Sequence, residues 1–379
     1  MLETVNITSI WNSWATELEE HLPQCTSIGT ATGIGLYFDS NPMDYEPNVQ
    51  HHLIGGVIER VVDLLHQNQS AFLTIELTEF LYFIDNCNRK TVDGIELSEL
   101  SSQLESLVAD QALRLVRNNQ FDPYIGGFYQ MYYFLVSEKR ADIVKEGIYL
   151  LEQQSKYIDD RLAYFDSGFR EEELCLSITH GLAFYLQYLC ICFEKGLLSD
   201  IKLIEAYAHF LYNQCDEDSA NTSFFPDYLN DTRNSRLCLC YGDAGILYSL
   251  WKAFRILGSK TKLAQVEMLM LKTTDRIEEE STGVVDSSLL YGSAGLYLFY
   301  HECYRKTGKQ GLKNAAAYWK RIALDQVSAS MNGLKYRDGQ DSSKIHSFKF
   351  HEGLTGTLAV LGANNWKELQ KLNYFFYLN

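Results

Sequence analysis

The chain has 379 residues, of which 46% are hydrophobic, so it can bury the core of one large domain or of two ordinary ones. Its formal net charge is −16 and the acidic residues are dispersed, which argues against a nucleic-acid partner or an anionic membrane surface. No apolar stretch is long enough to cross a bilayer, and the first residues do not form a signal peptide. We therefore expect a cytoplasmic protein without membrane insertion, and the spacing of its 9 cysteines favours reduced thiols.

The composition favours helices over strands, because there are only 5 prolines and few runs of β-branched residues. In the first part of the chain, apolar side chains recur at helical spacing in several segments. We expect helices over residues 2–22, 48–67, 71–86, 95–117 and 139–157. Two further segments, beginning near residues 28 and 124, open with small residues and continue as apolar runs. The pattern predicts that apolar and amphipathic helices alternate.

A glycine-entered apolar helix recurs in the second half of the chain. Glycines at positions 181, 242, 292 and 353 each open an apolar run, so the spacing lies between 50 and 61 residues. More polar helical patterns follow the first three runs, near residues 199–214, 258–279 and 310–326. A repeat of helix pairs at such a period indicates an array in which each unit buries a face against the next.

The alternation of helix types predicts the architecture. Helices that are apolar nearly all round are expected to be buried on all sides, whereas their amphipathic partners face solvent. We therefore predict an all-α fold, an α/α toroid with about seven inner and about seven outer helices, in one domain over residues 1–379. An open solenoid is the alternative, but it would expose more apolar surface. In a toroid the glycine-entered helix ends gather at one end of the ring.

Residues able to do chemistry come shortly before these glycines and before Gly126, which opens the apolar run near residue 124. They are Asp122, His180, Arg236, Cys240, Tyr241, Tyr291 and His351. A carboxylate, an imidazole, a guanidinium, a phenol and a thiol at the positive ends of helices form a plausible acid/base and thiol site. The helix dipole also predicts that the Cys240 thiol is more acidic than a free cysteine.

These segments, in this order, resemble the lanthionine synthetase C-like (LanC-like) cyclases. The Cys-Tyr-Gly segment of that family matches Cys240-Tyr241-Gly242, and its upstream arginine falls on Arg236. The Ala-His-Gly segment of the family corresponds to Thr179-His180-Gly181. Its Tyr-Asp-x-x-x-Gly segment corresponds to Phe121-Asp122 followed by Gly126. The resemblance covers nearly the whole chain and implies an α/α toroid.

The resemblance also implies an activity, the Michael addition of cysteine thiols to dehydroalanine or dehydrobutyrine in a dehydrated precursor peptide. It makes His180, Asp122, Arg236 and Tyr241 candidates for proton transfer and enolate stabilisation. His180 is the best acid or base, because the unperturbed imidazole titrates near neutrality. Further candidates for substrate binding are Cys240, Tyr291 and His351. The expected partners are the precursor peptide and, as a further candidate, a lanthipeptide dehydratase.

The sequence departs from the family at its metal. Family members hold catalytic zinc with the cysteine of the Cys-Tyr-Gly segment and with a Cys-His pair before the next glycine; here that pair is Leu290-Tyr291. Leucine cannot ligate, and a phenol is a poor zinc ligand. We therefore expect no metal cofactor, although Cys238, His346 or His351 could in principle replace the lost ligands. A thiol is partly ionised at neutral pH, so a metal-free cyclase is chemically feasible.

Other interpretations of the same residues are simpler or belong to other classes. His180 alone could be a hydrogen-bonded core histidine, and Asp122 could merely cap a helix. The protein could be a non-catalytic LanC-like scaffold that binds a peptide or docks a dehydratase. A toroidal glycoside hydrolase would need two facing carboxylates, and Asp122, Asp243 and Glu352 show no such pairing in the sequence. An active site is nevertheless favoured, because the chain retains five residues of the family's site together: Asp122, His180, Arg236, Cys240 and Tyr241.

Overall fold

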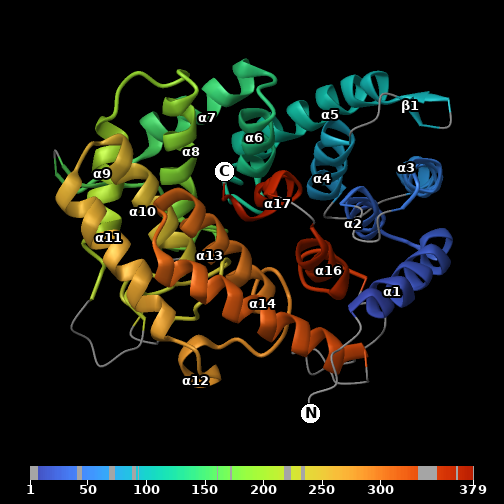
Figure 1. The fold of residues 1–379 in the computed structure, drawn as a ribbon. Helices are drawn as coiled ribbons and strands as arrows, with labels where there is room; N and C mark the ends of the chain where they lie inside the picture. Colours follow the sequence, from blue (N-terminus) through green and yellow to red (C-terminus); the bar gives the residue numbers. More distant parts are fainter. Residues whose placement is uncertain are drawn as a thin grey trace, which may run out of the picture. The chain divides into compact units, whose positions relative to one another are not determined.

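The structure of the protein is a computed structural model. It describes residues 7–40, 45–67, 73–87, 91–92, 94–159, 161–170, 173–216, 223–231, 235–331, 348–363 and 366–378. Helices make up most of these residues, which confirms the predicted all-α class (Figure 1). In the described ranges, strands are limited to two short antiparallel pairs. They are β1 (Thr91–Val92) with β2 (Ile95–Glu96), and β3 (Lys156–Tyr157) with β4 (Ala163–Tyr164).

The helices expected to be apolar are largely buried. They are α2 (Ile28–Asp39), α4 (Leu73–Asn86), α6 (Gly127–Val136), α8 (Leu182–Glu194), α10 (Asp243–Ile256), α13 (Ser293–Thr307) and α16 (Leu354–Gly362). In α8, for example, every side chain from Leu182 to Cys192 is buried. A helix without a polar face cannot lie on a surface, so the pattern and the burial agree.

Amphipathic helices alternate with the buried ones. They are α1 (Ile7–His21), α3 (Pro47–Gln67), α5 (Leu97–Arg117), α7 (Ala141–Gln154), α9 (Lys202–Tyr212), α11 (Lys260–Lys272), α14 (Gln310–Met331) and α17 (Trp366–Asn373). The described residues also include short turns of helix: α12 (Glu279–Thr282), η1 (Leu22–Gln24), η2 (Thr273–Asp275) and η3 (Tyr374–Phe376). The start of the predicted helix 2–22 lies partly outside the described residues. The helix expected over 139–157 ends earlier, because strand β3 begins at Lys156.

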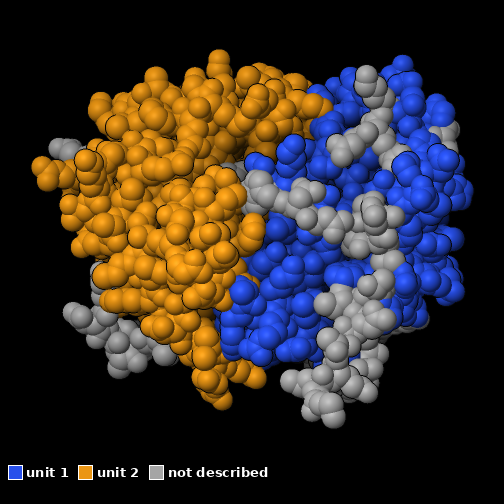
Figure 2. All heavy atoms as spheres, in the orientation of Figure 1, with its two compact units in different colours: residues 1–108, 285–298, 317–372 blue, residues 109–284, 299–316, 373–379 orange. Residues whose placement is uncertain are grey.

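The chain separates into two compact units, which are interleaved in sequence (Figure 2). Unit 1 comprises residues 1–108, 285–298 and 317–372, and unit 2 comprises residues 109–284, 299–316 and 373–379. The predicted organisation as one domain over residues 1–379 stays a prediction. None of the described helices combines the length and the apolar character that crossing a membrane would require.

In unit 1, α2 packs against α3, α4 and α16. Small residues on α2 allow these close approaches. A Cβ atom on Gly33 would lie 2.9 Å from the Cβ of Phe350, and one on Gly35 would lie 2.8 Å from the ring of Phe83. The glycines that the sequence showed in this helix are therefore required by packing.

In unit 2, α8 packs against α6, α9 and α10, while α7 covers α6 and α11 covers α10. Aromatic side chains fill the space between α6 and α8. The Phe128 ring meets the rings of Tyr185 and Tyr188 edge-on, with centroids 5.1 and 5.6 Å apart. Edge-to-face contacts of this kind add to the free energy gained by burying the rings. They make a rigid base for the loops that precede these helices.

The loop before α10 needs glycine for two reasons. Gly242 has φ +85°, a left-handed conformation that other residues rarely adopt. A Cβ atom at this position would also lie 2.0 Å from the carbonyl oxygen of Arg236. The chain therefore closes a tight turn directly before the helix.

We predict that Gly242→Ala lowers the free energy of unfolding more than Gly258→Ala does. Gly258 has a similar φ of +65° but has no atom within 4 Å of the position of an added Cβ, so it controls for the backbone conformation alone. The excess loss at Gly242 should be about 1–3 kcal/mol, the cost of forcing atoms into filled space. Urea unfolding of both variants measures it. Equal losses would show that the turn before α10 opens without cost.

Candidate active site

An aspartate and a histidine form a buried pair in unit 2. Nδ1 of His180 lies 3.0 Å from Oδ2 and 3.2 Å from Oδ1 of Asp122. The two residues are 8% and 5% exposed, so water competes little for this contact. The residues are 58 positions apart in sequence, and the sequence had placed both in one site without pairing them. The pair is the centre of the candidate active site.

The Asp122 carboxylate is fixed by its own loop as well as by the histidine. Its Oδ1 accepts hydrogen bonds from the backbone N–H groups of Tyr124 (2.8 Å) and Ile125 (2.9 Å). Its carbonyl oxygen accepts the N–H of Gly126, the residue that precedes α6. Asp122 therefore caps the turn before α6, as the simpler interpretation held, and faces His180 as well.

The position of His180 is set by its backbone and by aromatic rings. Its N–H donates to Oγ of Ser177 (3.2 Å), and its carbonyl oxygen accepts the hydroxyl of Ser167 (2.6 Å). The imidazole stacks on Phe169, with centroids 3.9 Å apart and planes at 15°. Tyr241 stacks on it less closely, with centroids at 5.7 Å. The ring thus has a defined plane before any substrate arrives.

This arrangement assigns different tasks to the two imidazole nitrogens. A carboxylate beside Nδ1 selects the tautomer in which Nδ1 carries the proton. Nε2 is then left with the lone pair, and it can accept or return a proton. An aspartate that orients a histidine in this way also stabilises the imidazolium once it forms. In the structure, the Asp122 carboxylate thus faces the imidazole of His180.

The Cys240 loop is tied to the His180 loop through Thr179. The Thr179 hydroxyl lies 2.8 Å from the carbonyl oxygen of Cys240 and 3.1 Å from its Sγ. Cys240 is 2% exposed, and the loop continues through Tyr241 and Gly242 into α10. The structure therefore brings Asp122, His180, Tyr241 and Cys240 together, four of the residues that the sequence singled out.

Burial dominates the acidity of the groups around this loop. It raises the pKa of the Cys175 thiol to about 12 and that of Cys238 to about 11, although Arg236 partly offsets the shift at Cys238. The pKa of Tyr241 is also raised, first by burial and then by Cys240 and Tyr228. The Tyr241 phenol therefore remains a hydrogen-bond donor. The greater acidity expected for Cys240 stays a prediction.

Arg236 lies on the loop that leads to Cys240. The aliphatic part of its side chain packs over Gly283, where an added Cβ would lie 3.0 Å from Cγ of Arg236. Its positive charge partly offsets the burial that raises the pKa of Cys238. Its carbonyl oxygen lies against Gly242, 2.0 Å from where a Cβ atom would be. Arg236 is therefore close enough to Cys238 for its charge to act on that thiol. Its predicted role in enolate stabilisation stays a prediction.

A buried ion pair, which the sequence did not reveal, supports the same loop. Asp243 is fully buried, and its Oδ2 lies 2.5 Å from Nη1 of Arg276. Asp243 also accepts the N–H groups of Phe224 and Phe225, while Arg276 donates to the carbonyl of Ser235. Asp243 is thus committed to structure and Asp122 to His180, which gives no support to a hydrolase built on these carboxylates. Nothing in the spacing of the sequence points to Arg276.

Tyr291 and His351, the remaining predicted residues, belong to unit 1. Nε2 of His351 lies 2.7 Å from Oε1 of Glu79 on α4, a partner that the sequence analysis missed. The carbonyl oxygen of His351 accepts the N–H groups of Leu289 and Leu290, at 3.1 and 3.2 Å. Tyr291 is partly buried, two residues before α13 begins. Their predicted role in substrate binding stays a prediction.

The donor set does not fit the zinc site of the family. Leu290 offers no lone pair, Tyr291 offers a phenol, and the Sγ of Cys240 faces the hydroxyl of Thr179. Among the described residues, no three histidine, cysteine or acidic side chains gather as a metal site. His346, one of the candidates to restore a ligand, lies outside the described residues.

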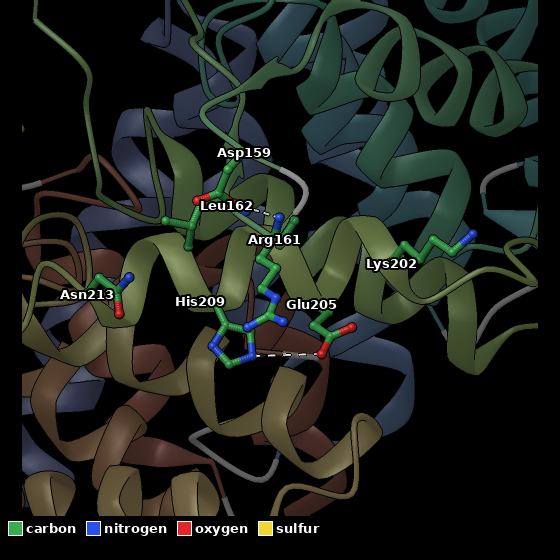
Figure 3. Close-up of a pocket in the computed structure, with 8 residues that line it drawn as sticks. Asp159, Arg161, Leu162, Lys202, Glu205, His209 and Asn213 are labelled. Atoms are coloured by element: carbon green, nitrogen blue, oxygen red, sulfur yellow. Dashed lines mark hydrogen bonds and ion pairs between the residues drawn. The ribbon is translucent and has the colours of Figure 1, made fainter.

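A pocket of about 500 Å³ lies at another place in unit 2, between α9 and the loop that joins β3 to β4 (Figure 3). Its charged lining includes Arg161, Glu205 and His209. Nε2 of His209 lies 3.9 Å from Oε1 of Glu205. None of the predicted site residues lines it.

Comparison with known proteins places the chain in a family. Residues 109–361 match the family described as Lanthionine synthetase C-like protein, which is more than half of the chain. A search of curated proteins found no match. The matched range contains the Asp122 turn, the His180 loop and the Cys240 loop. The chain therefore belongs to the lanthionine synthetase C-like family, as the resemblance indicated, and an α/α toroid is consistent with that membership.

We predict that Cys175 and Cys238 react slowly with iodoacetamide in the folded protein. With pKa values near 12 and 11, their thiolate fractions at pH 8 should fall at least about a hundredfold below those of the unfolded chain. Because a raised pKa is the cause, labelling should rise about tenfold per pH unit between pH 8 and 10. Peptide mapping by mass spectrometry, with a urea-unfolded reference, measures each site. Labelling of Cys238 at the unfolded rate would contradict the assigned burial.

Proposed function

We propose that this protein is a lanthipeptide cyclase, an enzyme that adds cysteine thiols of a precursor peptide to dehydroalanine or dehydrobutyrine without using zinc. The observation that carries the proposal is the His180–Asp122 pair, next to the Cys240 loop, in a chain of the lanthionine synthetase C-like family. A peptide-binding scaffold would gain nothing from a histidine whose Nδ1 is held by a buried carboxylate.

The proposed reaction uses one proton twice. Nε2 of His180 takes the proton from the substrate thiol, and the thiolate forms the C–S bond at the β-carbon of the dehydro residue. The electron pair of the double bond moves into an enolate, and the imidazolium returns the proton to the α-carbon. No proton is gained or lost overall. Asp122 stabilises the imidazolium that exists between the two transfers.

The enolate oxygen needs positive charge in its neighbourhood. We assign this task to Arg236 and to the positive end of α10, which begins directly after the Cys240-Tyr241-Gly242 turn. The Tyr241 phenol stays protonated and can donate a hydrogen bond to the same oxygen. Neither Arg236 nor Tyr241 needs to give up a proton, so both stabilise the enolate by electrostatics alone.

Aromatic side chains around His180 suit a peptide substrate. Tyr124 meets the imidazole edge-on, and Phe169 stacks on its face. Tyr228 lies beside Tyr241, and the guanidinium of Arg170 sits 4.5 Å from the centre of the Tyr228 ring. We propose that this aromatic group holds the dehydrated precursor peptide, and that a dehydratase supplying that peptide is a second partner. Cys240, Tyr291 and His351 are the further substrate contacts in this proposal.

We predict that His180→Gln lowers the rate of ring formation about 10²–10⁴-fold, the range expected for loss of general acid–base catalysis. Asp122→Asn should also lower it, because an amide cannot stabilise the imidazolium. The assay mixes purified protein with a dehydrated peptide and counts unreacted cysteines by N-ethylmaleimide labelling and mass spectrometry. His209→Gln, a histidine on the outer helix α9, is the control and should retain full activity. Unchanged ring formation in His180→Gln would overturn the mechanism.

We predict that the purified protein contains well below one zinc per chain, because Cys240 is the one family ligand retained. Chelators should leave its Tm and its cyclase activity unchanged. The double substitution Leu290→Cys with Tyr291→His should create tight zinc binding, detectable by elemental analysis. Stoichiometric zinc in the unmodified protein would show that other residues supply ligands, and the metal-free mechanism would then have to be abandoned.

A further inference from the structure

Two buried tyrosine hydroxyls hold the backbone on either side of Asp122. The hydroxyl of Tyr185 donates to the carbonyl oxygen of Phe121 at 3.0 Å. The hydroxyl of Tyr377 donates to the carbonyl oxygen of Pro123, also at 3.0 Å. The residue before Asp122 and the residue after it are thus each bonded to a tyrosine from another part of unit 2.

We propose that Tyr185 and Tyr377 are positioning residues, which fix Asp122 so that its carboxylate meets Nδ1 of His180. This inference rests on the proposed function, because it assigns to both tyrosines a task in the proton transfer by His180. Neither tyrosine is a catalytic residue, since both act on the backbone next to Asp122.

Tyr185 couples the two members of the pair through one helix. It lies in the first turn of α8, and His180 lies two residues before that helix begins. The hydroxyl of Tyr185 reaches back to the Asp122 turn, so α8 carries the histidine and also holds the loop of its carboxylate partner. The side chain is 0% exposed, and its ring packs against Phe128 and Phe165 at 5.1 and 4.7 Å. A ring packed in this way cannot easily move its hydroxyl.

Tyr377 is held just as firmly, although it lies outside the helices. Its φ of 56° is unusual for a residue with a side chain and turns the phenol toward the Asp122 loop. The amide of Gln187 on α8 donates to its carbonyl oxygen, and Tyr248 on α10 donates to the carbonyl of Leu378 at 2.8 Å. Its ring meets Phe184 edge-on at 4.9 Å. The segment is therefore anchored on two buried helices.

Both phenols remain donors over the whole accessible pH range. Burial raises the pKa of Tyr185 and of Tyr377 well above the ordinary value, and the charge of Asp122 adds to the shift in each case. A protonated phenol can only donate to a carbonyl oxygen, so the direction of both hydrogen bonds is fixed. The arrangement is preorganised, which is what a group that orients a catalytic histidine requires.

The test compares three tyrosine-to-phenylalanine substitutions that each remove one buried hydroxyl. Tyr185→Phe and Tyr377→Phe remove the bonds to the Asp122 loop. Tyr188→Phe is the matched control, because Tyr188 lies one turn further along α8, is 0% exposed, and donates to the carbonyl of Val144 on α7 at 3.0 Å. All three variants are assayed well below their Tm, so that loss of fold does not contribute.

We predict that Tyr185→Phe and Tyr377→Phe each lower kcat for ring formation about tenfold with little change in KM, since misplacing a catalytic group by about 1 Å costs up to about a hundredfold. The double variant should lose less than the product of the two, because both hydroxyls hold one loop. Tyr188→Phe should stay within about twofold of the unmodified protein. Equal losses in all three variants, or no loss at Tyr185 and Tyr377, would overturn the proposal.

A second measurement is independent of catalysis. NMR on protein labelled selectively at histidine should show a slowly exchanging Nδ1–H of His180, assigned by its absence in His180→Gln. Its exchange should become at least about fivefold faster in Tyr185→Phe and Tyr377→Phe and stay unchanged in Tyr188→Phe. Exchange that is unchanged in all three variants, or absence of the resonance in the unmodified protein, contradicts the positioning role. If the unmodified protein forms no rings, the proposed function fails, and this measurement alone decides on the two tyrosines.

Discussion

The hydrogen bond between Asp122 and Nδ1 of His180 is the contact on which the proposed chemistry of this protein depends. Neither residue lies in a helix, and each occupies a turn directly before one. Both turns close on themselves so tightly that a glycine must follow. A Cβ on Gly126 would lie 2.6 Å from the backbone nitrogen of Asp122, and one on Gly181 would lie 2.0 Å from the carbonyl oxygen of Cys175. Gly126 and Gly181 thus allow the two tight turns that position this carboxylate and this imidazole.

The sequence predicted the helices and singled out both His180 and Asp122, and the reason is physical. Apolar residues on every side of a helix require burial, and a glycine at its start requires a tight turn, so both leave a local signal. The contacts of Tyr185 and Tyr377 leave none, because their hydroxyls bind backbone carbonyls, which every residue has. The salt bridge of Asp243 with Arg276 joins residues 33 positions apart and depends on the tertiary fold. Helix α17 was not predicted, since its 8 residues make about two turns and leave only a weak periodic signal.

Two opposing effects act on the thiols around the Cys240 loop, and their sizes decide the outcome. A helix N-terminus stabilises a nearby anion by about 0.3–1 kcal/mol, less than one pKa unit, whereas full burial shifts a pKa by up to about 3–5 units. Burial therefore prevails at Cys175 and Cys238, whose pKa values rise. These protein thiols are poor nucleophiles near neutral pH. In the proposed reaction, the proton transfer is accordingly assigned to His180, whose Nδ1 is held by the Asp122 carboxylate.

Leu290 and Tyr291 stand at the positions where the resemblance would place two zinc ligands of the family, and this bears on how a substrate thiol would be activated. Zinc would activate a substrate thiol by charge, and such activation tolerates small errors in the position of the base. In the proposed metal-free reaction, the thiol is activated by proton transfer to Nε2, which works only at hydrogen-bond distance and in line with the lone pair. A buried carboxylate that orients the imidazole, and two tyrosines that hold the loop of this carboxylate, supply that precision. In this proposal, rigid placement of His180 takes over part of the work that a metal ion would do by its charge.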